Sequence, residues 1–435
     1  MKNRLLILSL HLATFYVVLA ALEHFVAPIY FYEGYVWTPN EAKWYGAVAL
    51  VMLLSLITPI TSSKPSTLFY QLSLLFVLIP MLALFYGQDG PWEYTLQVCA
   101  AYSVSVFLVY FLRIRPPSLH LVSKEKLQTI LFLVACAYIA SIFMLGGGKY
   151  LNFDLSRVYD FRGDASSNLP GFYGYISPLI GKVVVPIGFV LALIHRKYLM
   201  AFLFMGCAVL IFGLTAHKST LFAPFLIFFV YAVSEKKQIS LKLNAAILIV
   251  LVIALADFWM YEKYGDSVFG WVGNLIMRRS FMVPAHINYM YYDFFSQNNF
   301  VLFSNSKLTL GMLEYEYPLD VAHLIGSIYH NDERISANTG WLGSGYMQGG
   351  FIVLLIYAAV IAAIFGYIDA CARAAGNRAL ITASVAVPIL ALITSADLPT
   401  AFLTHGLYVN LLLIACFHER NASNAYRPFK QRAFA

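Results

Sequence analysis

Charged residues are scarce in this chain, and several common motifs are missing from it. Asp, Glu, Lys and Arg make up only 12% of the 435 residues, whereas hydrophobic residues make up 60% and the mean hydropathy is +0.71. So few charges cannot cover a water-facing surface, which excludes soluble globular proteins. The five cysteines show neither a disulfide framework nor zinc spacing, and no phosphate-binding loop, dinucleotide fingerprint or nucleophile elbow occurs. ATP-driven transport and serine-hydrolase chemistry therefore have no support in the sequence.

Long apolar runs recur along almost the whole chain. A helix of about 20 residues, rising 1.5 Å per residue, crosses a hydrocarbon core of ~30 Å. We therefore expect an all-α polytopic membrane protein, one integral membrane domain over residues 1–435 with about twelve transmembrane helices. The first run is too long for a signal peptide and has no small-residue cleavage site, so we expect it to be retained. The runs are 5–26, 44–60, 67–86, 94–112, 127–145, 172–194, 198–215, 219–234, 241–259, 342–366, 379–396 and 400–418.

Positive charge is distributed unevenly between the connections of these runs. If the chain starts inside, 18 of the 29 Lys and Arg but only four of the 22 Asp and Glu fall on inward segments. Lys and Arg are enriched in cytoplasmic loops, so both termini are predicted in the cytoplasm. The net charge of +7 reflects mostly this bias, and we expect no nucleic-acid partner.

Two segments on the outward face stand out, 146–171 and the much longer 260–341. A connection of about 80 residues is far beyond the usual loop length and is more often functional than accidental. The first segment carries Arg157 and Arg162 among aspartates, in a pattern that predicts a short surface helix. Either the arginines pair with these aspartates, or both guanidinium groups converge on a phosphate.

The second segment contains "MRRSFMVPAHINYMYYDFF", residues 277–295. Arg278 and Arg279 lie on the side of the membrane where positive charge is disfavoured, which indicates a role other than topology. The pattern predicts amphipathic helices along the membrane surface, broken or kinked at Pro284. The aromatic residues that follow form an interfacial belt or, in the second interpretation, stack on sugars or on the isoprene units of a lipid. His286 is one candidate base.

The same segment continues with "EYEYPLDVAHLIGSIYHNDERISANTGWLGSGYMQGGF", residues 314–351. Histidines and carboxylates are the side chains that accept protons from sugar hydroxyls near neutral pH. We favour His323 as the base, because its apolar surroundings can pack against the membrane domain, with Asp320 to orient or replace it and with His330 as a further candidate. A zinc site is the lesser alternative here, because the spacing matches no HExxH-type arrangement, and no metal is expected. In the tight outward turn "TAHKSTL", Lys218 suits a pyrophosphate headgroup or simply marks a solvated turn.

The layout of many spans, a modest outward loop with arginines and a long late outward loop resembles that of Wzy-type polymerases, which join oligosaccharide repeat units of O-antigen and related bacterial surface polysaccharides. Locally, "MRRSFMVPAHINYMYYDFF" is similar to that family's arginine-containing segment, "SANTGWLGSGYMQGGF" to its glycine-rich entry into the next span, and "TAHKSTL" to its short basic turn. Arg334 and Gly345 are separated by ten residues, as in a pattern of some members, whereas Arg157 and Arg162 do not complete it.

The resemblance implies a GT-C-like layout and a glycosyltransferase without a cofactor, at the periplasmic face of the bacterial inner membrane. The expected substrates are repeat units on undecaprenyl diphosphate, and a chain-length regulator protein is an expected partner. The growing glycan passes from one lipid diphosphate to the non-reducing sugar of another. Cationic side chains then stabilise the diphosphate in place of a metal ion. The residues expected to do so are Arg278, Arg279, Arg157, Arg162, Lys218 and Arg334.

Two other functions remain open at this stage. A polysaccharide flippase can have as many spans, and Lys182 within the sixth run favours it, although snorkelling to the interface explains that lysine equally well. The O-antigen ligase has a similar layout and transfers the finished chain to the lipid A core.

Overall fold

The computed structural model describes residues 2–60, 64–115, 123–154, 170–235, 238–265, 268–306, 309 and 311–417. Every regular element in these residues is a helix, and no strand occurs among them, which confirms the all-α prediction. The chain forms two compact units. Unit 1 comprises Met1–Arg113, Lys236–Gly366 and Pro388–Leu403, and unit 2 comprises Ile114–Glu235, Tyr367–Val387 and Thr404–Ala435.

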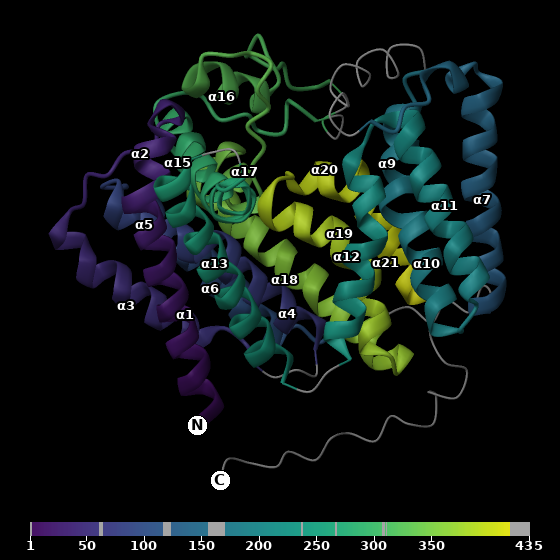
Figure 1. Cartoon of the computed structure of the whole chain (residues 1–435), viewed down its shortest axis with the longest axis horizontal. Coiled ribbons are helices and arrows are strands. Elements are labelled where there is room, and N and C mark those ends of the chain that lie inside the picture. Colours follow the sequence, from purple (N-terminus) through teal and green to yellow (C-terminus); the bar gives the residue numbers. More distant parts are fainter. Residues whose placement is uncertain are drawn as a thin grey trace. The chain divides into compact units, whose positions relative to one another are not determined.

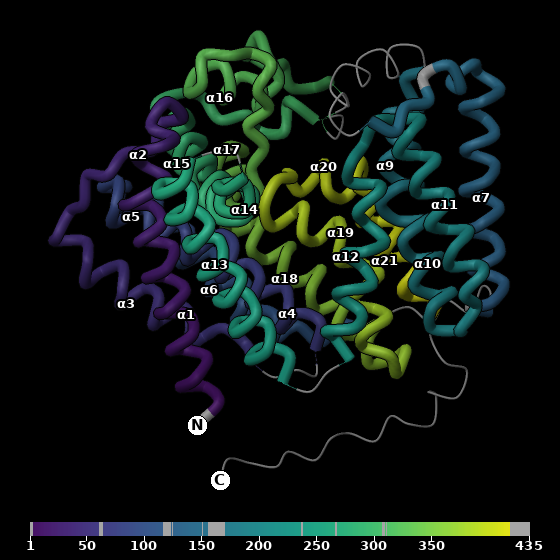
Figure 2. The backbone as a smooth tube through the Cα atoms, in the orientation of Figure 1, coloured from purple at the N-terminus to yellow at the C-terminus, as the bar shows by residue number. Residues whose placement is uncertain are grey.

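Unit 1 combines the first helices of the chain with much later ones. Figure 2 shows α13 beside α1, although the two lie far apart in sequence. Figure 1 places α16 and the N-terminus at opposite ends of this unit. Its elements are α1 (Lys2–Ala21), η1 (Leu22–Val26), α2 (Ala27–Ile29), η2 (Phe31–Glu33), α3 (Glu41–Ile57), α4 (Pro65–Ser73), η3 (Leu74–Leu78), α5 (Ile79–Gly87), α6 (Trp92–Phe111), α13 (Ile239–Tyr264), α14 (Trp271–Gly273), η6 (Asn274–Met282), α15 (Val283–Phe295), α16 (Val321–His330), α17 (Trp341–Met347), most of α18 (Gly350–Ala375), the end of α19 (Arg378–Thr394) and α20 (Leu398–Leu403).

Unit 2 is built mainly from the middle of the chain. Its helices pack as neighbours along the sequence, with α10 against α11 and α11 against α12. Its elements are α7 (Lys124–Met144), η4 (Gly147–Tyr150), α9 (Tyr173–Leu179), η5 (Ile180–Val184), α10 (Val185–Ile194), α11 (Tyr198–Thr215), α12 (Lys218–Ser234), the end of α18, most of α19, and α21 (Leu407–Ala415).

Many of these helices are long and apolar enough to cross a membrane, which supports a multi-pass membrane protein. The described residues contain eight of them: Asn3–Ile29, Pro65–Gly87, Trp92–Phe111, Glu125–Met144, Tyr173–Ile194, Tyr198–Thr215, Ile239–Tyr264 and Gly350–Ala375. The other expected spans are shorter, because α3, α12 and α19 have 17 residues each. The range 400–418 divides into α20 and α21 near Gly406, whose φ of 73° no other residue type adopts easily. The count of twelve spans therefore stays a prediction.

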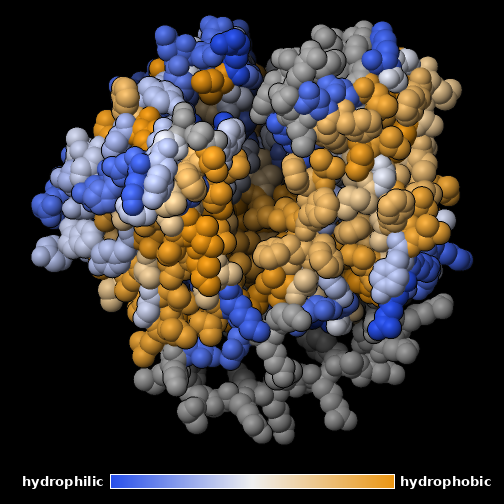
Figure 3. Space-filling view, viewed as in Figure 1, coloured by the Kyte–Doolittle hydropathy of each residue, from blue (hydrophilic) through white to orange (hydrophobic). Residues whose placement is uncertain are grey.

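The surfaces of the long helices are apolar where they face outward. On α13, Ile249 and Ile253 are 60% and 55% exposed, which suits contact with lipid and not with water. The segment Pro65–Gly87 differs from α13, because 94% of the residues in its most apolar 18-residue stretch are buried. This segment lies in the core of unit 1. On the face shown in Figure 3, hydrophobic residues cover the body of unit 1, and hydrophilic residues gather at the end that carries α16.

Candidate functional site

The arginine pair lies on one continuous helix that runs through α14, η6 and α15. The middle part, η6, is a π-helix, in which the N–H of Val283 donates to the carbonyl of Arg278 five residues back. Wide turns of this kind relieve the clash that a proline ring makes with the carbonyl four residues before it. The helix therefore continues through Pro284, so the expected break does not occur there, and the irregularity before the proline is the π-helix.

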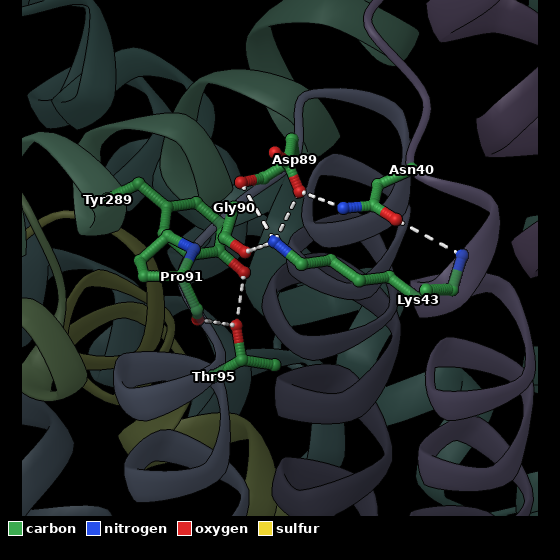
Figure 4. A network of polar contacts seen from close by, with 8 residues as sticks. Asn40, Lys43, Asp89, Gly90, Pro91, Thr95 and Tyr289 are labelled. Carbon is green, nitrogen blue, oxygen red and sulfur yellow. Dashed lines mark hydrogen bonds and ion pairs between the residues drawn. The ribbon is translucent and has the colours of Figure 1, made fainter.

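This helix packs against the buried core of unit 1. Phe281 stacks on Phe76 of η3, with ring centroids 4.4 Å apart. The hydroxyl of Tyr289 donates to the carbonyl of Met81 over 3.1 Å. The same hydroxyl lies 2.9 Å from Thr95 Oγ1 (Figure 4). These rings thus serve to anchor the helix inside the unit. Tyr291 and Phe295 of the expected belt are also buried, whereas Tyr292 and Phe294 are partly exposed, so a belt over the whole aromatic run stays a prediction.

Arg278 is buried and its guanidinium is largely occupied. It donates to both carboxylate oxygens of Glu33, one of them at 3.0 Å, and it donates to Asn274 Oδ1 over 2.8 Å. The guanidinium carbon lies 4.4 Å from the ring centroid of Tyr30. Arg278 is only 8% exposed, so the ion pair with Glu33 neutralises its charge in a place that water hardly reaches.

Arg279 presents the opposite surroundings, although it is the next residue. Its side chain is exposed, and no hydrogen bond or ion pair engages its guanidinium among the described residues. It lines two cavities of unit 1. A planar fork of donors that is free and adjoins a cavity is well suited to bind a phosphate.

The first cavity, of about 490 Å³, is lined by several polar side chains among apolar ones, and we call it the polar cavity. Arg279, His286, His330 and Ser336 line it, together with the Glu33–Arg278 pair. Because that pair is neutral overall, Arg279 gives this polar cavity a net positive charge. The polar cavity can hold an anionic group with hydroxyls around it.

The second cavity, of about 400 Å³, is mostly apolar. Its walls include Leu72 and Phe76 from the core segment and Leu390 and Ile393 from α19. Arg279, Val283 and Ile287 line both cavities, so the apolar cavity adjoins the polar cavity along the same face of the η6–α15 helix.

His286 is held in a neutral form at the polar cavity. Burial and, to a smaller extent, the nearby His330 lower its pKa to about 4. The ring of Tyr35 lies against the imidazole, with centroids 4.4 Å apart. At neutral pH one ring nitrogen of His286 is therefore free of a proton and can accept one.

The other residues expected in the late loop lie outside both cavities. His323 Nδ1 donates to the carbonyl of Glu333 over 2.7 Å, which ties α16 to the segment after it, and His323 Nε2 lies 3.9 Å from a carboxylate oxygen of Asp320. Arg334 is 90% exposed at its side chain and pairs with Asp332 over 2.9 Å. The structure thus brings His286 and His330 to the polar cavity, and it does not bring His323, Asp320 or Arg334 there.

The remaining expected residues belong elsewhere. Lys218 begins α12 in unit 2, and Lys182 lies in η5 of the same unit, where its ammonium is 3.1 Å from His405 Nδ1. Arg157 and Arg162 fall outside the described residues. The diphosphate role of Lys218, Arg157 and Arg162 therefore stays a prediction.

Sequence reasoning missed Glu33 and Tyr35, which lie on the connection between α2 and α3. An acidic residue in the aromatic stretch "YFYEGYVW" was the only signal, and it gave no indication that Arg278, far away in the chain, was its partner.

No group of three or more His, Cys, Asp or Glu side chains that would hold a metal ion occurs in the part of the chain that the structure describes. Searches of protein-family models, of curated proteins and of solved structures found no match to this chain.

Proposed function

We propose that this protein polymerises oligosaccharide repeat units carried on a polyprenyl diphosphate, as a glycosyltransferase of the outer face of a bacterial inner membrane. The observation that carries the proposal is the sharing of Arg279, Val283 and Ile287 by a polar and an apolar cavity. A substrate that fits both must join a hydrophobic chain to an anionic group and a polar group. A lipid-linked sugar diphosphate is such a substrate.

Each part of this substrate has a complementary region in unit 1. The apolar cavity suits the first isoprene units, which gain free energy by leaving water. The diphosphate suits Arg279, whose free guanidinium offers a bidentate contact. The sugar suits the polar cavity, which the exposed ring of Tyr32 lines.

The chemistry follows from the groups at the polar cavity. The hydroxyl oxygen of the acceptor sugar attacks the anomeric carbon of the donor glycan, and the bond from that carbon to the diphosphate oxygen breaks. The hydroxyl proton passes to the unprotonated nitrogen of His286, or to His330 across the cavity. The lipid diphosphate leaves with the electron pair, and Arg279 stabilises the charge that develops on it.

His286 replaces His323 as the favoured base, because a base must come within about 3 Å of the hydroxyl that it deprotonates. His286 lines the polar cavity together with Arg279. His323 lines neither cavity, and its Nδ1 donates a hydrogen bond to the backbone carbonyl of Glu333. A bound diphosphate also places negative charge near His286, which raises the proton affinity of its imidazole once the substrate is present.

A deletion strain tests this function against its rivals. The lipid-linked and surface glycans of a strain that lacks the gene are separated by size, with and without the gene restored. Surface glycan of a single repeat unit in the deletion strain supports a polymerase. Long chains that are not joined to lipid A core would instead identify a ligase, and repeat units that accumulate in the cytoplasm would identify a flippase.

A further inference from the structure

The connection between α2 and α3 is a fixed wall of the polar cavity. We call residues 30–43, which include η2 and the start of α3, the strap. Its first part carries Tyr32, Glu33 and Tyr35, all of which line the polar cavity. A loop on a membrane protein surface is ordinarily mobile, so the contacts that hold this one in place are informative.

The far end of the strap is held by a buried lysine. Lys43 is 7% exposed, and its ammonium pairs with the Asp89 carboxylate at 2.5 Å and donates to the carbonyls of Asp89 and Gly90 at 3.0 and 2.6 Å (Figure 4). Asn40 donates to the same carboxylate over 2.8 Å. With its three N–H groups satisfied, Lys43 joins the strap to the turn between α5 and α6 and has no donor left for a ligand.

The near end is held by Arg278. The guanidinium donates to both carboxylate oxygens of Glu33, and Gln88 donates to the carbonyl of Gly34 over 3.2 Å, so the strap is held at these two consecutive residues. Gly34 adopts a left-handed conformation with φ of 88° and packs so closely that a Cβ there would lie 3.3 Å from His286 Cε1. Tyr35, only 1% exposed, covers the imidazole face.

We propose that Arg278 and Glu33 form a positioning pair, which fixes the strap so that Tyr35 and Gly34 hold the imidazole of His286 toward the polar cavity, and that Arg278 is not itself a ligand of the diphosphate. The catalytic meaning of this pair rests on the proposed function. The positioning of the imidazole does not rest on the proposed function, because it follows from the contacts among the Arg278–Glu33 pair, the strap and His286.

The two neighbouring arginines therefore divide two tasks. Arg278 uses three of its donor positions on Glu33 and Asn274 and stacks on Tyr30, so binding a phosphate would require it to abandon a buried partner. Arg279 has no such partner among the described residues and faces both cavities.

Chemical labelling of His286 tests the geometry without any activity. The purified full-length protein is treated with diethyl pyrocarbonate, and carbethoxylation of His286 is quantified by mass spectrometry against the exposed His24 as an internal standard. Glu33→Gln and Arg278→Gln each remove one side of a buried ion pair, so each should raise the labelling rate of His286 about tenfold or more through local opening. The matched control is Glu262→Gln, at an exposed glutamate of α13, which should leave the rate unchanged.

The double variant separates positioning from ligand binding. If the two residues act as a pair, Glu33→Gln with Arg278→Gln should label no faster than either single variant. Tyr35→Ala should raise the rate, and Tyr35→Phe, which keeps the ring, should restore protection. Unchanged labelling in both Glu33→Gln and Arg278→Gln would overturn the proposal even if the protein proves to be a polymerase.

Activity provides a second, distinguishable readout. If Arg278 were a diphosphate ligand, Glu33→Gln would release its guanidinium and improve or preserve kcat/KM. A positioning pair predicts that both single variants lower kcat/KM by a similar factor. Opening the site to water also brings the pKa of His286 back toward its ordinary value, although Arg278, Arg279 and His330 remain near it, so the acid limb of kcat/KM should move to higher pH. If Glu33→Gln speeds the labelling of His286 but leaves the acid limb of kcat/KM unmoved, the pair does not position a base.

Discussion

Replacing Arg279 with alanine should remove the main positive charge from the site without weakening the fold. The side chain is exposed and has no polar partner among the described residues, so its loss leaves no buried group unpaired. We therefore expect unchanged thermal stability and membrane level for Arg279→Ala, together with a loss of transfer activity. This combination distinguishes a ligand of the substrate from a residue that supports the fold.

The size of the loss follows from the position of the guanidinium. Unit charges about 4 Å apart attract by about 4 kcal/mol at an effective dielectric constant of about 20. Loss of one preorganised contact to a developing charge typically costs about 3 kcal/mol, or about a hundredfold in rate. Solvent screens the exposed Arg279, so we expect a reduction of about tenfold to a hundredfold in kcat/KM. Arg279→Lys should recover part of it, because a point charge lacks the bidentate fork.

The assay measures chain growth on a purified lipid-linked repeat unit by gel separation of the products at several salt concentrations. Arg334→Ala is the matched control, since Arg334 is an exposed arginine of the same unit that pairs with Asp332 and lines neither cavity. Loss of a typical contact to the diphosphate would lower activity by much more than about twofold. If the activity of Arg279→Ala stays within about twofold of the wild type, this guanidinium does not bind the diphosphate.

Three further variants probe the base, the wall and the lipid cavity. His286→Ala should lower kcat about a hundredfold or more while His323→Ala retains activity, and the reverse result in single-turnover kinetics would return the base to α16. Gly326→Ala places a methyl group against the backbone carbonyl of Ile335 at the polar cavity, so thermal denaturation should show a loss of about 1–3 kcal/mol, and unchanged stability would contradict that packing. Leu390→Trp should fill the apolar cavity and raise KM for a polyprenyl substrate but not for a short-chain analogue, and equal effects on both would refute a lipid in that cavity.

The general class of the fold was predictable from the sequence because it depends on length and hydropathy. Apolar runs such as 67–86 and 241–259 correspond to helices of the structure, Pro65–Gly87 and Ile239–Tyr264. Runs near the minimum length were less decisive, since 400–418 reads as one span in the sequence but is divided near Gly406. Hydropathy and helical propensity do not show where such a run is interrupted. The interruption depends on the left-handed backbone conformation of Gly406, which the hydrophobic pattern does not reveal.

The composition of the site was predictable only in part. The unusual position of the arginine pair indicated a function. Nothing in the sequence, however, distinguished the role of Arg278 from that of Arg279. The two arginines differ in burial and in partners because Arg278 binds Glu33. Glu33 lies 245 positions earlier in the chain and meets Arg278 only through tertiary packing. The sequence also could not show that His286 and not His323 lines the polar cavity. An apolar stretch such as "LDVAHLIGSIY" indicates that a helix packs, but it does not indicate which side chains share a cavity.

Reconstitution tests the central claim most directly. The purified protein is placed in liposomes with a single oligosaccharide repeat unit on undecaprenyl diphosphate, and no other protein or nucleotide is added. We expect a ladder of longer lipid-linked glycans with release of undecaprenyl diphosphate, and we expect Arg279→Ala to produce this ladder far more slowly. If the wild-type protein binds this lipid but forms no product longer than one repeat unit, the proposed polymerase activity is wrong.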